Sequence, residues 1–374
     1  MIYLDNAATT LPDPQVIAVI TETLSQYPGN PSSLHKLGRE ANRLLTSCRE
    51  TILASLGGEG RLVFTAGGTE SNNWAIAGAL HLMRHRGRHI VSTAIEHDAV
   101  LSPLRELADR GYEVTLLQPD AFGQISPDDL ARALREDTAL VSIMQVNNET
   151  GAILPISEMA QIVDAHSNAL FHTDAVQAFG KIPVHPSALG VDLLSISAHK
   201  LHGPRGIGTL WIRNSVKLPP FLRGGGQENG LRSGTEALHN IAGFAKAVSL
   251  SMAELSETTA HLEGLQIYLR EKLPASLPFV RFLPQGAPHI VSLSLPGAKS
   301  EVLMNALDGQ DIYLSHASAC KRGGRSHVLS AMGLPADVID GTLRVSFSRE
   351  TSLADLDALI TALTMACNTL FPRL

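Results

Sequence analysis

The chain of 374 residues contains only three cysteines, Cys48, Cys320 and Cys367. Three is an odd number and too few for a disulfide framework, so the count indicates a reduced, cytoplasmic environment. Aromatic residues make up only 5% of the chain, which argues against stacking platforms for single-stranded nucleic acid. The formal net charge is −6, so the sequence carries no basic footprint for direct nucleic-acid binding.

Long apolar runs are also missing. No stretch approaches the roughly 18 consecutive apolar residues that span a bilayer. The first five residues show neither the basic region nor the apolar region of a signal peptide. We therefore expect a cytoplasmic protein without membrane association. The hydrophobic content of 44% is enough for a large core, in two or three units or in one large α/β domain with an appendage.

Short apolar runs that favour strands alternate with amphipathic helical patterns through the first two-thirds of the chain. We expect strands at 61–65, 89–93, 111–117, 139–146, 169–173, 192–197 and 206–212, and helices at 33–56, 70–83, 102–110, 127–136 and 156–166. Near-continuous apolar strands are typical of a mainly parallel sheet with helices on both faces. The last strand follows its predecessor after a short loop, so it is expected to run antiparallel.

A charged helical stretch at 237–273 leads into a different, smaller α+β pattern. There we expect strands at 290–295 and 342–347, and helices at 300–308, 326–332 and 352–370. The interpretation is a large domain over residues 14–250. A small domain is then formed by residues 1–13 and 251–374.

Two glycines join the expected strand at 61–65 to the following helix. Gly67 and Gly68 permit a positive φ, and the free N–H groups at a helix start attract an anion. Gly68 and Thr69 would then hold a phosphate group. An ordinary turn between strand and helix explains this spacing equally well.

Charged residues follow two other apolar strands. Lys200 follows the strand at 192–197, and burial there would lower its pKa toward the amine that forms an imine. The alternative is a lysine that has simply reached the surface. Asp174 follows the strand at 169–173, where it would either pair with a protonated pyridine nitrogen or cap the next helix. A phosphate cradle, an aspartate and a lysine are together the three anchors that pyridoxal phosphate needs.

The surroundings of Cys320 differ from those of the other two cysteines. Three nearby basic residues surround Cys320 with positive charge, which favours the thiolate. Cys48 and Cys367 lie inside helical patterns, where cysteine acts as a small hydrophobe. Cys320 is therefore the first candidate for a nucleophile. The sequence has no CxxC pair and no HExxH motif, so no dedicated metal site is expected.

Motifs in order along essentially the whole chain resemble those of the cysteine desulfurases, a branch of the aminotransferase class V group. The motifs are YLDNAATT (3–10), NPSSLH (30–35), FTAGGTESNN (64–73), VNNETG (146–151), HTDAVQ (172–177), SAHK (197–200) and GGGQENGLRSGT (224–235). Ser-Ala-Cys at 318–320 is similar to the branch whose cysteine lies on a loop of the small domain. The resemblance implies the fold type I of pyridoxal-phosphate-dependent transferases, with a mainly parallel seven-stranded sheet in the large domain.

The resemblance also implies roles for individual residues. Lys200 would carry the cofactor, Asp174 would pair with its pyridinium nitrogen, and His97 would stack on the ring and assist proton transfer. The other residues implied to bind the cofactor are Asn148, Gln177, Gly68, Thr69, Ser197, His199 and, from the second subunit of a homodimer, Thr235. Arg344 would grip the substrate carboxylate, with Asn30 nearby.

The implied activity converts L-cysteine to L-alanine and leaves a persulfide on Cys320. The persulfide would pass to an acceptor protein, either an iron–sulfur scaffold or a tRNA-thiolating enzyme, and Cys320 could transiently ligate a cluster. Two alternatives stay open: another class V enzyme, such as an aminotransferase or selenocysteine lyase, and a catalytically weak sulfur-transfer scaffold. The sequence departs from the family pattern at Ala317, often glycine, and Arg325, often proline, and only five residues separate Cys320 from Ser326.

Overall fold

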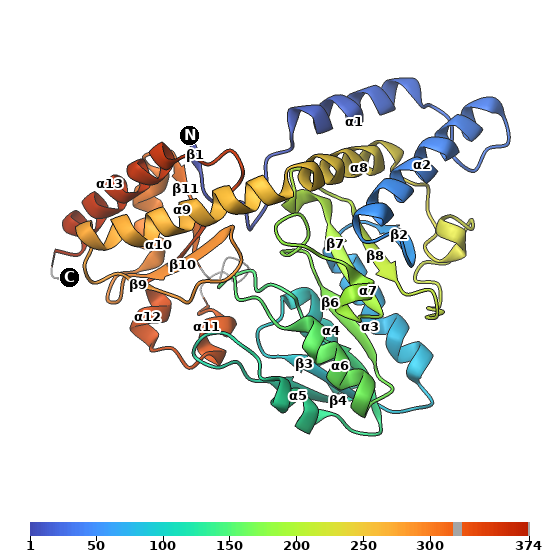
Figure 1. Ribbon diagram of the computed structural model, residues 1–374, viewed down its shortest axis with the longest axis horizontal. Coiled ribbons are helices and arrows are strands. Elements are labelled where there is room, and N and C mark those ends of the chain that lie inside the picture. The colour runs from blue at the N-terminus through green and yellow to red at the C-terminus, as the bar shows by residue number, and fades with distance from the viewer. Residues whose placement is uncertain (317–323, 373–374) are drawn as a thin grey trace.

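A computed structural model describes residues 1–316 and 324–372 (Figure 1). Its largest sheet has seven strands in the order β2-β8-β7-β6-β5-β3-β4. The strands are β2 (Arg61–Thr65), β3 (His89–Thr93), β4 (Glu113–Leu117), β5 (Thr138–Ser142), β6 (Leu170–Asp174), β7 (Leu193–Ser197) and β8 (Gly208–Ile212). Strands β3 to β7 pair in parallel, and β8 runs antiparallel to both of its neighbours. The expected sheet, including its antiparallel strand, is confirmed.

Neighbouring residues of these strands pack into two different hydrophobic cores, because side chains alternate between the faces of a sheet. Val141 and Leu194 belong to one core, and the adjacent Leu140 and Leu193 belong to the other. The helices over the first core are α2 (Lys36–Ser55), α6 (Ile156–His166) and α8 (Leu238–Ala253), and those over the second are α3 (Gly68–Met83) and α4 (Asp98–Asp109). Both faces of the sheet are therefore covered, as the apolar strands predict.

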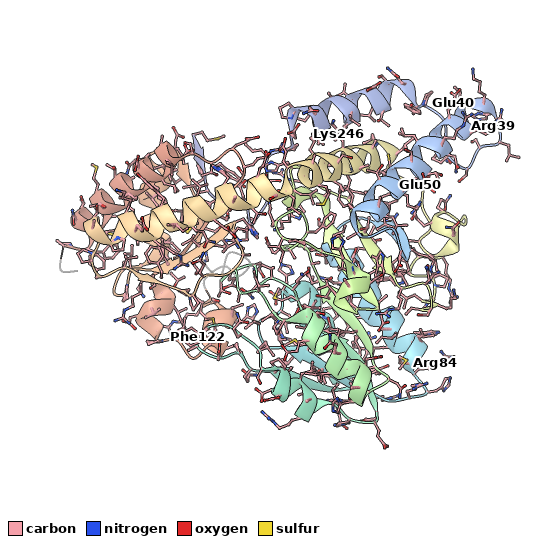
Figure 2. The ribbon with its side chains drawn as sticks, viewed as in Figure 1. Arg39, Glu40, Glu50, Arg84, Phe122 and Lys246 are labelled. Atoms are coloured by element: carbon pink, nitrogen blue, oxygen red, sulfur yellow. The ribbon has the colours of Figure 1, made fainter. Side chains whose placement is uncertain are left out.

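Charged side chains occupy the outer faces of these helices. Figure 2 shows Arg39 and Glu50 of α2, and Arg84 at the end of α3, near the periphery of the molecule. Buried residues of α2, such as Ala41 and Ile52, lie on its other face. The apolar faces of the helices are thus left for the core.

Helix α1 (Pro14–Gln26) is a difference from the expectation, because no helix was predicted there. The Asp13 carboxylate caps it by accepting the N–H of Gln15 at 2.7 Å, and Pro14 occupies its first position. Both are helix-start signals that a search for caps would have found. We call the part of the molecule that contains the seven-stranded sheet the large half, and the part that contains the other sheet the small half. The remaining short helices of the large half are α5 (Pro127–Ala133), α7 (Pro186–Leu189), η1 (Ala198–Lys200) and η2 (Glu228–Gly230).

The expectation of a single helical stretch at 237–273 is wrong in one respect, because the structure has two helices there. Helix α8 ends before Glu254, and α9 (Leu255–Ser276) begins after it. Helix α8 packs into the core of the large sheet, whereas Leu262 and Leu269 of α9 belong to the core of the other half. Because of this break, α8 and α9 can pack into different cores. The domain division at residues 14–250 stays a prediction.

The second half of the molecule, at the left of Figure 1, is a four-stranded antiparallel sheet covered by helices. Its strands are β12 (Ser315–His316), β13 (Thr342–Ser346), β10 (Ile290–Ser294) and β9 (Arg281–Phe282), in that order. Its further helices are α10 (Ser300–Asp308), α11 (His327–Ala331), α12 (Ala336–Asp340) and α13 (Leu353–Leu370). The N-terminal strand β1 (Ile2–Tyr3) pairs with β11 (Ile312–Tyr313), which brings the start of the chain here.

Helix α13 is the one helix of the described chain that is long and apolar enough to cross a membrane by length and composition alone. Such helices also occur in protein cores. Here Leu356, Leu359 and Leu363 of α13 are buried in the core of the small sheet. Ser352 and Asp355 form a capping box at its start. Its contacts are those of a helix that packs inside a folded domain.

Candidate active site

A pocket of about 410 Å³ opens where the strands of the large sheet end and the small sheet approaches. Ten predicted site residues line it: Gly68, Thr69, His97, Asn148, Asp174, Gln177, Ser197, His199, Lys200 and Arg344. Ligands of open α/β sheets bind at this edge, because the carboxyl ends of parallel strands meet there.

Two predicted site residues that the structure describes are not among the residues that line this pocket. Asn30 is exposed in the turn before α2, where its side chain accepts the N–H of Ser32 at 2.8 Å. Thr235 is exposed in the segment after η2. Cys320 lies outside the described residues, so the structure does not place it.

The N-terminus of α3 forms one wall of the pocket. Gly67, with φ of +151°, precedes the helix. A Cβ added to Gly68 would lie only 2.8 Å from Val176 Cγ2, so the close approach of the two segments requires glycine at Gly68. The first N–H groups of an α-helix lack partners within it, and the helix dipole adds partial positive charge. This wall therefore suits a phosphate.

His199 lies beside the same wall as a neutral ring. Burial, followed by the charges of Lys200 and Arg205, lowers the pKa of His199 to about 4. Thr9 Oγ1 accepts a hydrogen bond from Arg205 Nε at 3.4 Å and lies 3.2 Å from His199 Nδ1. In the tautomer with its hydrogen on Nε2, the neutral ring accepts from Thr9 and offers an N–H donor to an anion.

Lys200 reaches the pocket from η1, directly after β7. Its Nζ donates to the carbonyl oxygens of Ala7 and Ala8, the latter at 2.8 Å. Both carbonyls belong to the N-terminal segment, which therefore crosses the large half at the pocket. These bonds hold the amine at the wall, where it can condense with an aldehyde.

Asp174, the last residue of β6, is 7% exposed. Its Oδ2 accepts Asn72 Nδ2 at 2.6 Å, and its Oδ1 accepts the N–H of Val176 at 2.9 Å. Both oxygens of this buried carboxylate therefore have hydrogen-bond donors. Asn72 belongs to the motif at 64–73, but no role for it was predicted from the sequence. The signal that could have identified Asn72 is its position, because its amide lies one turn into the helix that begins at the glycine pair.

Arg344 lies on β13 of the small sheet and is 3% exposed. Its Nη2 pairs with Asp5 Oδ1 at 2.8 Å, and its Nη1 donates to the backbone oxygen of Asn148 at 2.8 Å. Its Nε has no partner among the described residues. Asp5 was also missed as a site residue, although it belongs to the N-terminal motif. The two bonds fix the guanidinium plane at the pocket wall.

His97 caps the N-terminus of α4. Its Nδ1 accepts the N–H of Ala99 at 3.0 Å, so the neutral ring carries its hydrogen on Nε2. The preceding Glu96 is 1% exposed, and its Oε1 accepts the Thr93 hydroxyl at 2.8 Å and the Met144 N–H at 2.9 Å. Burial raises the pKa of Glu96 to about 8. Glu96 thus ties the end of β3 to the segment after β5 and fixes the backbone beside His97.

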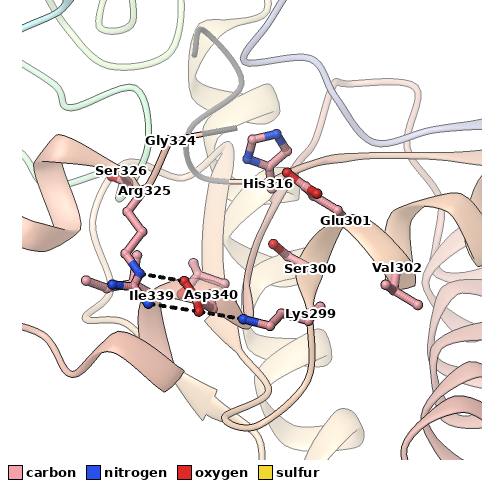
Figure 3. A pocket seen from close by; sticks show the side chains of 11 residues that line it. Lys299, Ser300, Glu301, Val302, His316, Gly324, Arg325, Ser326, Ile339 and Asp340 are labelled. Carbon is pink, nitrogen blue, oxygen red and sulfur yellow. Dashed lines mark hydrogen bonds and ion pairs between the residues drawn. The ribbon is translucent and has the colours of Figure 1, made fainter. Parts of the chain in front are cut away.

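A second cavity, of about 250 Å³, lies in the small half (Figure 3). On its wall, Arg325 donates to Asp340 Oδ1 at 2.8 Å. Ser326 caps α11, and its hydroxyl also donates to Glu149 of the large half. Arg325 and Ser326 follow Cys320 by only five and six residues in the sequence. The chain directly after the cysteine segment is therefore attached to α12 and to the large half.

The other two cysteines are packing residues, as predicted. Cys48 and Cys367 are buried in α2 and α13. Burial raises the pKa of both thiols to about 11, which disfavours the thiolate. Within residues 1–316 and 324–372, no group of three His, Cys, Asp or Glu side chains is arranged to hold a metal ion.

Three chemical groups around the main pocket match the three ends of pyridoxal phosphate. The start of α3 with His199 provides donors for a phosphate, Asp174 provides a carboxylate for a ring nitrogen, and Lys200 provides an amine for the aldehyde. These residues therefore fit pyridoxal phosphate. The fold and the pocket define a pyridoxal-phosphate-dependent enzyme of fold type I.

Comparisons with known proteins agree on the family. The sequence profile of the aminotransferase class-V family matches residues 2–359. The cysteine desulfurase IscS of Dictyoglomus turgidum is 40% identical over 362 residues, which cover 95% of this chain and 92% of the relative. The chain therefore belongs to the aminotransferase class-V family, among its cysteine desulfurases.

Solved structures give the same result. A structure titled as a NifS-like protein matches with a TM-score of 0.91 and 36% identity, over 98% of this chain and 99% of that one. A structure of SspA in complex with cysteine matches with a TM-score of 0.81 and 31% identity, over 94% of this chain and 100% of that one. The family, the enzyme class and the cofactor predicted from the motifs are confirmed.

Proposed function

We propose that the pocket removes sulfur from L-cysteine, that L-alanine is the product, and that Cys320 receives the sulfur. The observation that carries this proposal is the meeting of Lys200, Asp174 and Arg344 around one pocket. Bound pyridoxal phosphate supplies an electron sink that acidifies the Cα proton of an attached amino acid.

The cofactor would be held by groups from three strand ends. The first N–H groups of α3, with Ser197 and His199, would bind the phosphate, and Asp174 would keep the ring nitrogen protonated. Lys200 would hold the cofactor before the substrate arrives. Once released, its amine is placed to take the Cα proton and return it.

Two side chains would act on the substrate itself. The buried guanidinium of Arg344 would bind the cysteine carboxylate, and its unpartnered Nε is a further donor for that anion. His97 would present Nε2–H to the reacting group, because its Nδ1 is used by the N–H of Ala99. These assignments make Arg344 a binding residue and His97 a proton-transfer residue.

The transfer of sulfur from the substrate to Cys320 needs no external oxidant. The Cys320 thiolate attacks the substrate sulfur, so that an S–S bond forms and the Cβ–S bond breaks. The electron pair of the broken bond stays on Cβ, which is protonated to become the methyl group of alanine. Cys320 keeps the sulfur as a persulfide for an acceptor, either an iron–sulfur scaffold or a tRNA-thiolating enzyme.

We further propose that the enzyme is a homodimer in the cytoplasm. Thr235 is exposed and lies off the pocket of its own chain, which supports a role for Thr235 of the partner subunit at the phosphate. Asn30, which is also exposed, would lie near the substrate. The scarcity of cysteine supports a reducing compartment.

The test is an assay of sulfide and alanine from L-cysteine in the presence of a thiol. We expect both products in a 1:1 ratio from the wild type and none from Lys200→Ala. Cys320→Ala should release no sulfide, and Cys48→Ala is the matched control that should stay active. Absence of sulfide from the wild type would refute the proposed function. Full activity of Cys320→Ala would refute the assignment of Cys320 as the residue that receives the sulfur.

A further inference from the structure

A hydrogen bond joins the small half of the molecule to the pocket wall through two buried side chains. His289 precedes β10, and its Nε2 lies 3.2 Å from Oε1 of Gln177. The backbone oxygen of His289 accepts the N–H of Phe347, directly after the strand that carries Arg344. The β10–β13 pair therefore places Arg344 at the pocket and His289 behind Gln177.

The orientation of the Gln177 amide follows from its other contact. Gln177 Nε2 donates to the backbone oxygen of Ala7 at 2.8 Å, and that oxygen also accepts Lys200 Nζ. A carbonyl oxygen can only accept, so the NH₂ group of Gln177 faces Ala7 and its Oε1 faces His289. His289 must then be the donor, through Nε2–H.

His289 has no second donor to offer. The side chain is 1% exposed, and burial together with the charges of Lys181, Lys200 and Arg344 holds its pKa well below the ordinary value. A neutral imidazole carries one N–H group, which is used on Gln177. Its Nδ1 has no partner in the part of the chain that the structure describes. The bond to Gln177 is therefore the one that fixes the tautomer.

We propose that His289 is a positioning residue that holds the Gln177 amide with its NH₂ group at the pocket. The inference rests on the proposed function and on a contact of Gln177 with the ring oxygen of the cofactor, which the family resemblance implies. One N–H of the NH₂ group is used on Ala7, and the other remains for that oxygen. Without His289, Oε1 of Gln177 would be a buried acceptor without a donor, and the side chain would rotate to recover one.

The test uses the visible absorption band of bound pyridoxal phosphate and the midpoint of its pH titration, measured without cysteine. Replacing the donor by His289→Phe should shift the midpoint by about half a pH unit or more, the value of one neutral hydrogen bond. Gln177→Ala should shift it equally. His289→Gln keeps an N–H at the Nε2 position and should restore the wild-type midpoint.

Coupling decides between positioning and general packing. In the Gln177→Ala background, His289→Phe should cause no further shift. The matched control is His261→Phe, since His261 bonds the Thr351 carbonyl away from the pocket. A folded His289→Phe protein with the wild-type midpoint would overturn the proposal, as would an undiminished shift in the Gln177→Ala background. If His289→Phe fails to fold, His289→Asn, whose amide reaches less far, is judged by the same criteria.

This experiment separates the proposal from the proposed function. It needs cofactor binding but no turnover of cysteine. A wild type that binds pyridoxal phosphate without releasing sulfide leaves the His289 proposal fully testable. A wild type that shows no visible band with pyridoxal phosphate overturns both.

Discussion

Asn72 donates a hydrogen bond of 2.6 Å to the buried carboxylate of Asp174, from the first turns of a helix to the end of a strand 102 residues away. This bond directs one oxygen of Asp174, while the N–H of Val176 directs the other. The same helix begins at the glycine pair that forms the phosphate wall. Through helix α3, the bond therefore connects the phosphate wall with Asp174, two of the three groups that would contact the cofactor.

Removing this bond should weaken cofactor binding. In Asn72→Ala, the carboxylate of Asp174 loses a charge-assisted hydrogen bond worth about 1.5–3 kcal/mol, so the Kd for pyridoxal phosphate should rise about 10- to 100-fold. The measurement is a fluorescence titration of apoenzyme with pyridoxal phosphate. Asn214→Ala, at an exposed position, is the control. An unchanged Kd in folded Asn72→Ala would show that Val176 alone orients the carboxylate.

A conservative change at Arg344 should affect substrate binding more than turnover. Lysine is a point charge and cannot make the bonds to Asp5 and to Asn148 in a fixed plane. We expect Arg344→Lys to raise the KM for cysteine about 10- to 100-fold with a smaller change in kcat. Steady-state kinetics measure both values, with the exposed Arg281→Lys as control. A fall in kcat alone would contradict the carboxylate assignment.

Ser326 should contribute to stability as well as to the position of the chain after Cys320. Ser326→Ala removes the cap of α11 and one buried donor to Glu149, at an expected cost of about 1–3 kcal/mol in the free energy of unfolding. Urea unfolding measures this difference. Ser326→Thr keeps the hydroxyl and should retain most of the stability, and the exposed Ser25→Ala should change little. A loss below about 0.5 kcal/mol in Ser326→Ala would show that neither contact matters.

Glu96 should make stability depend on pH. Burial raises the pKa of its carboxyl from 4.5 in the unfolded chain to about 8 in the folded protein. The folded state therefore holds the proton more tightly, and this contribution is complete below about pH 4.5 and is lost as the pH rises toward 8. Glutamine does not titrate. The free energy of unfolding of Glu96→Gln relative to the wild type should rise between about pH 5 and pH 8, by up to about 1.4 kcal/mol per pH unit.

Urea unfolding at several pH values within this window tests the effect. Glu271→Gln, an exposed change on α9, should show no such trend. A stability difference between Glu96→Gln and the wild type that stays constant with pH would mean that Glu96 is ionised in the folded protein.

Some elements could be predicted because their signals are local. Helix α6 has the predicted bounds, and β2 and β3 match the expected apolar runs, since periodicity and flanking turns lie within the segments. The expected strand at 139–146 ends at Ser142 instead. Beyond it, the N–H groups of Ile143 and Gln145 still donate to the backbone of β6 and its end, but Val146 forms an antiparallel bridge with Ile153 instead of continuing the strand.

The sequence alone determined which side chains could hold the cofactor. Lys200, Asp174 and the glycine pair at the start of α3 each follow an apolar strand, and parallel strands place such ends at one edge of a sheet. Tertiary structure alone decided the pairs Asp5–Arg344, Asn72–Asp174 and Gln177–His289. Their partners are 102 to 339 residues apart in the chain. No local pattern encodes such pairs, because they depend on strand order and on how the small sheet packs against the large one.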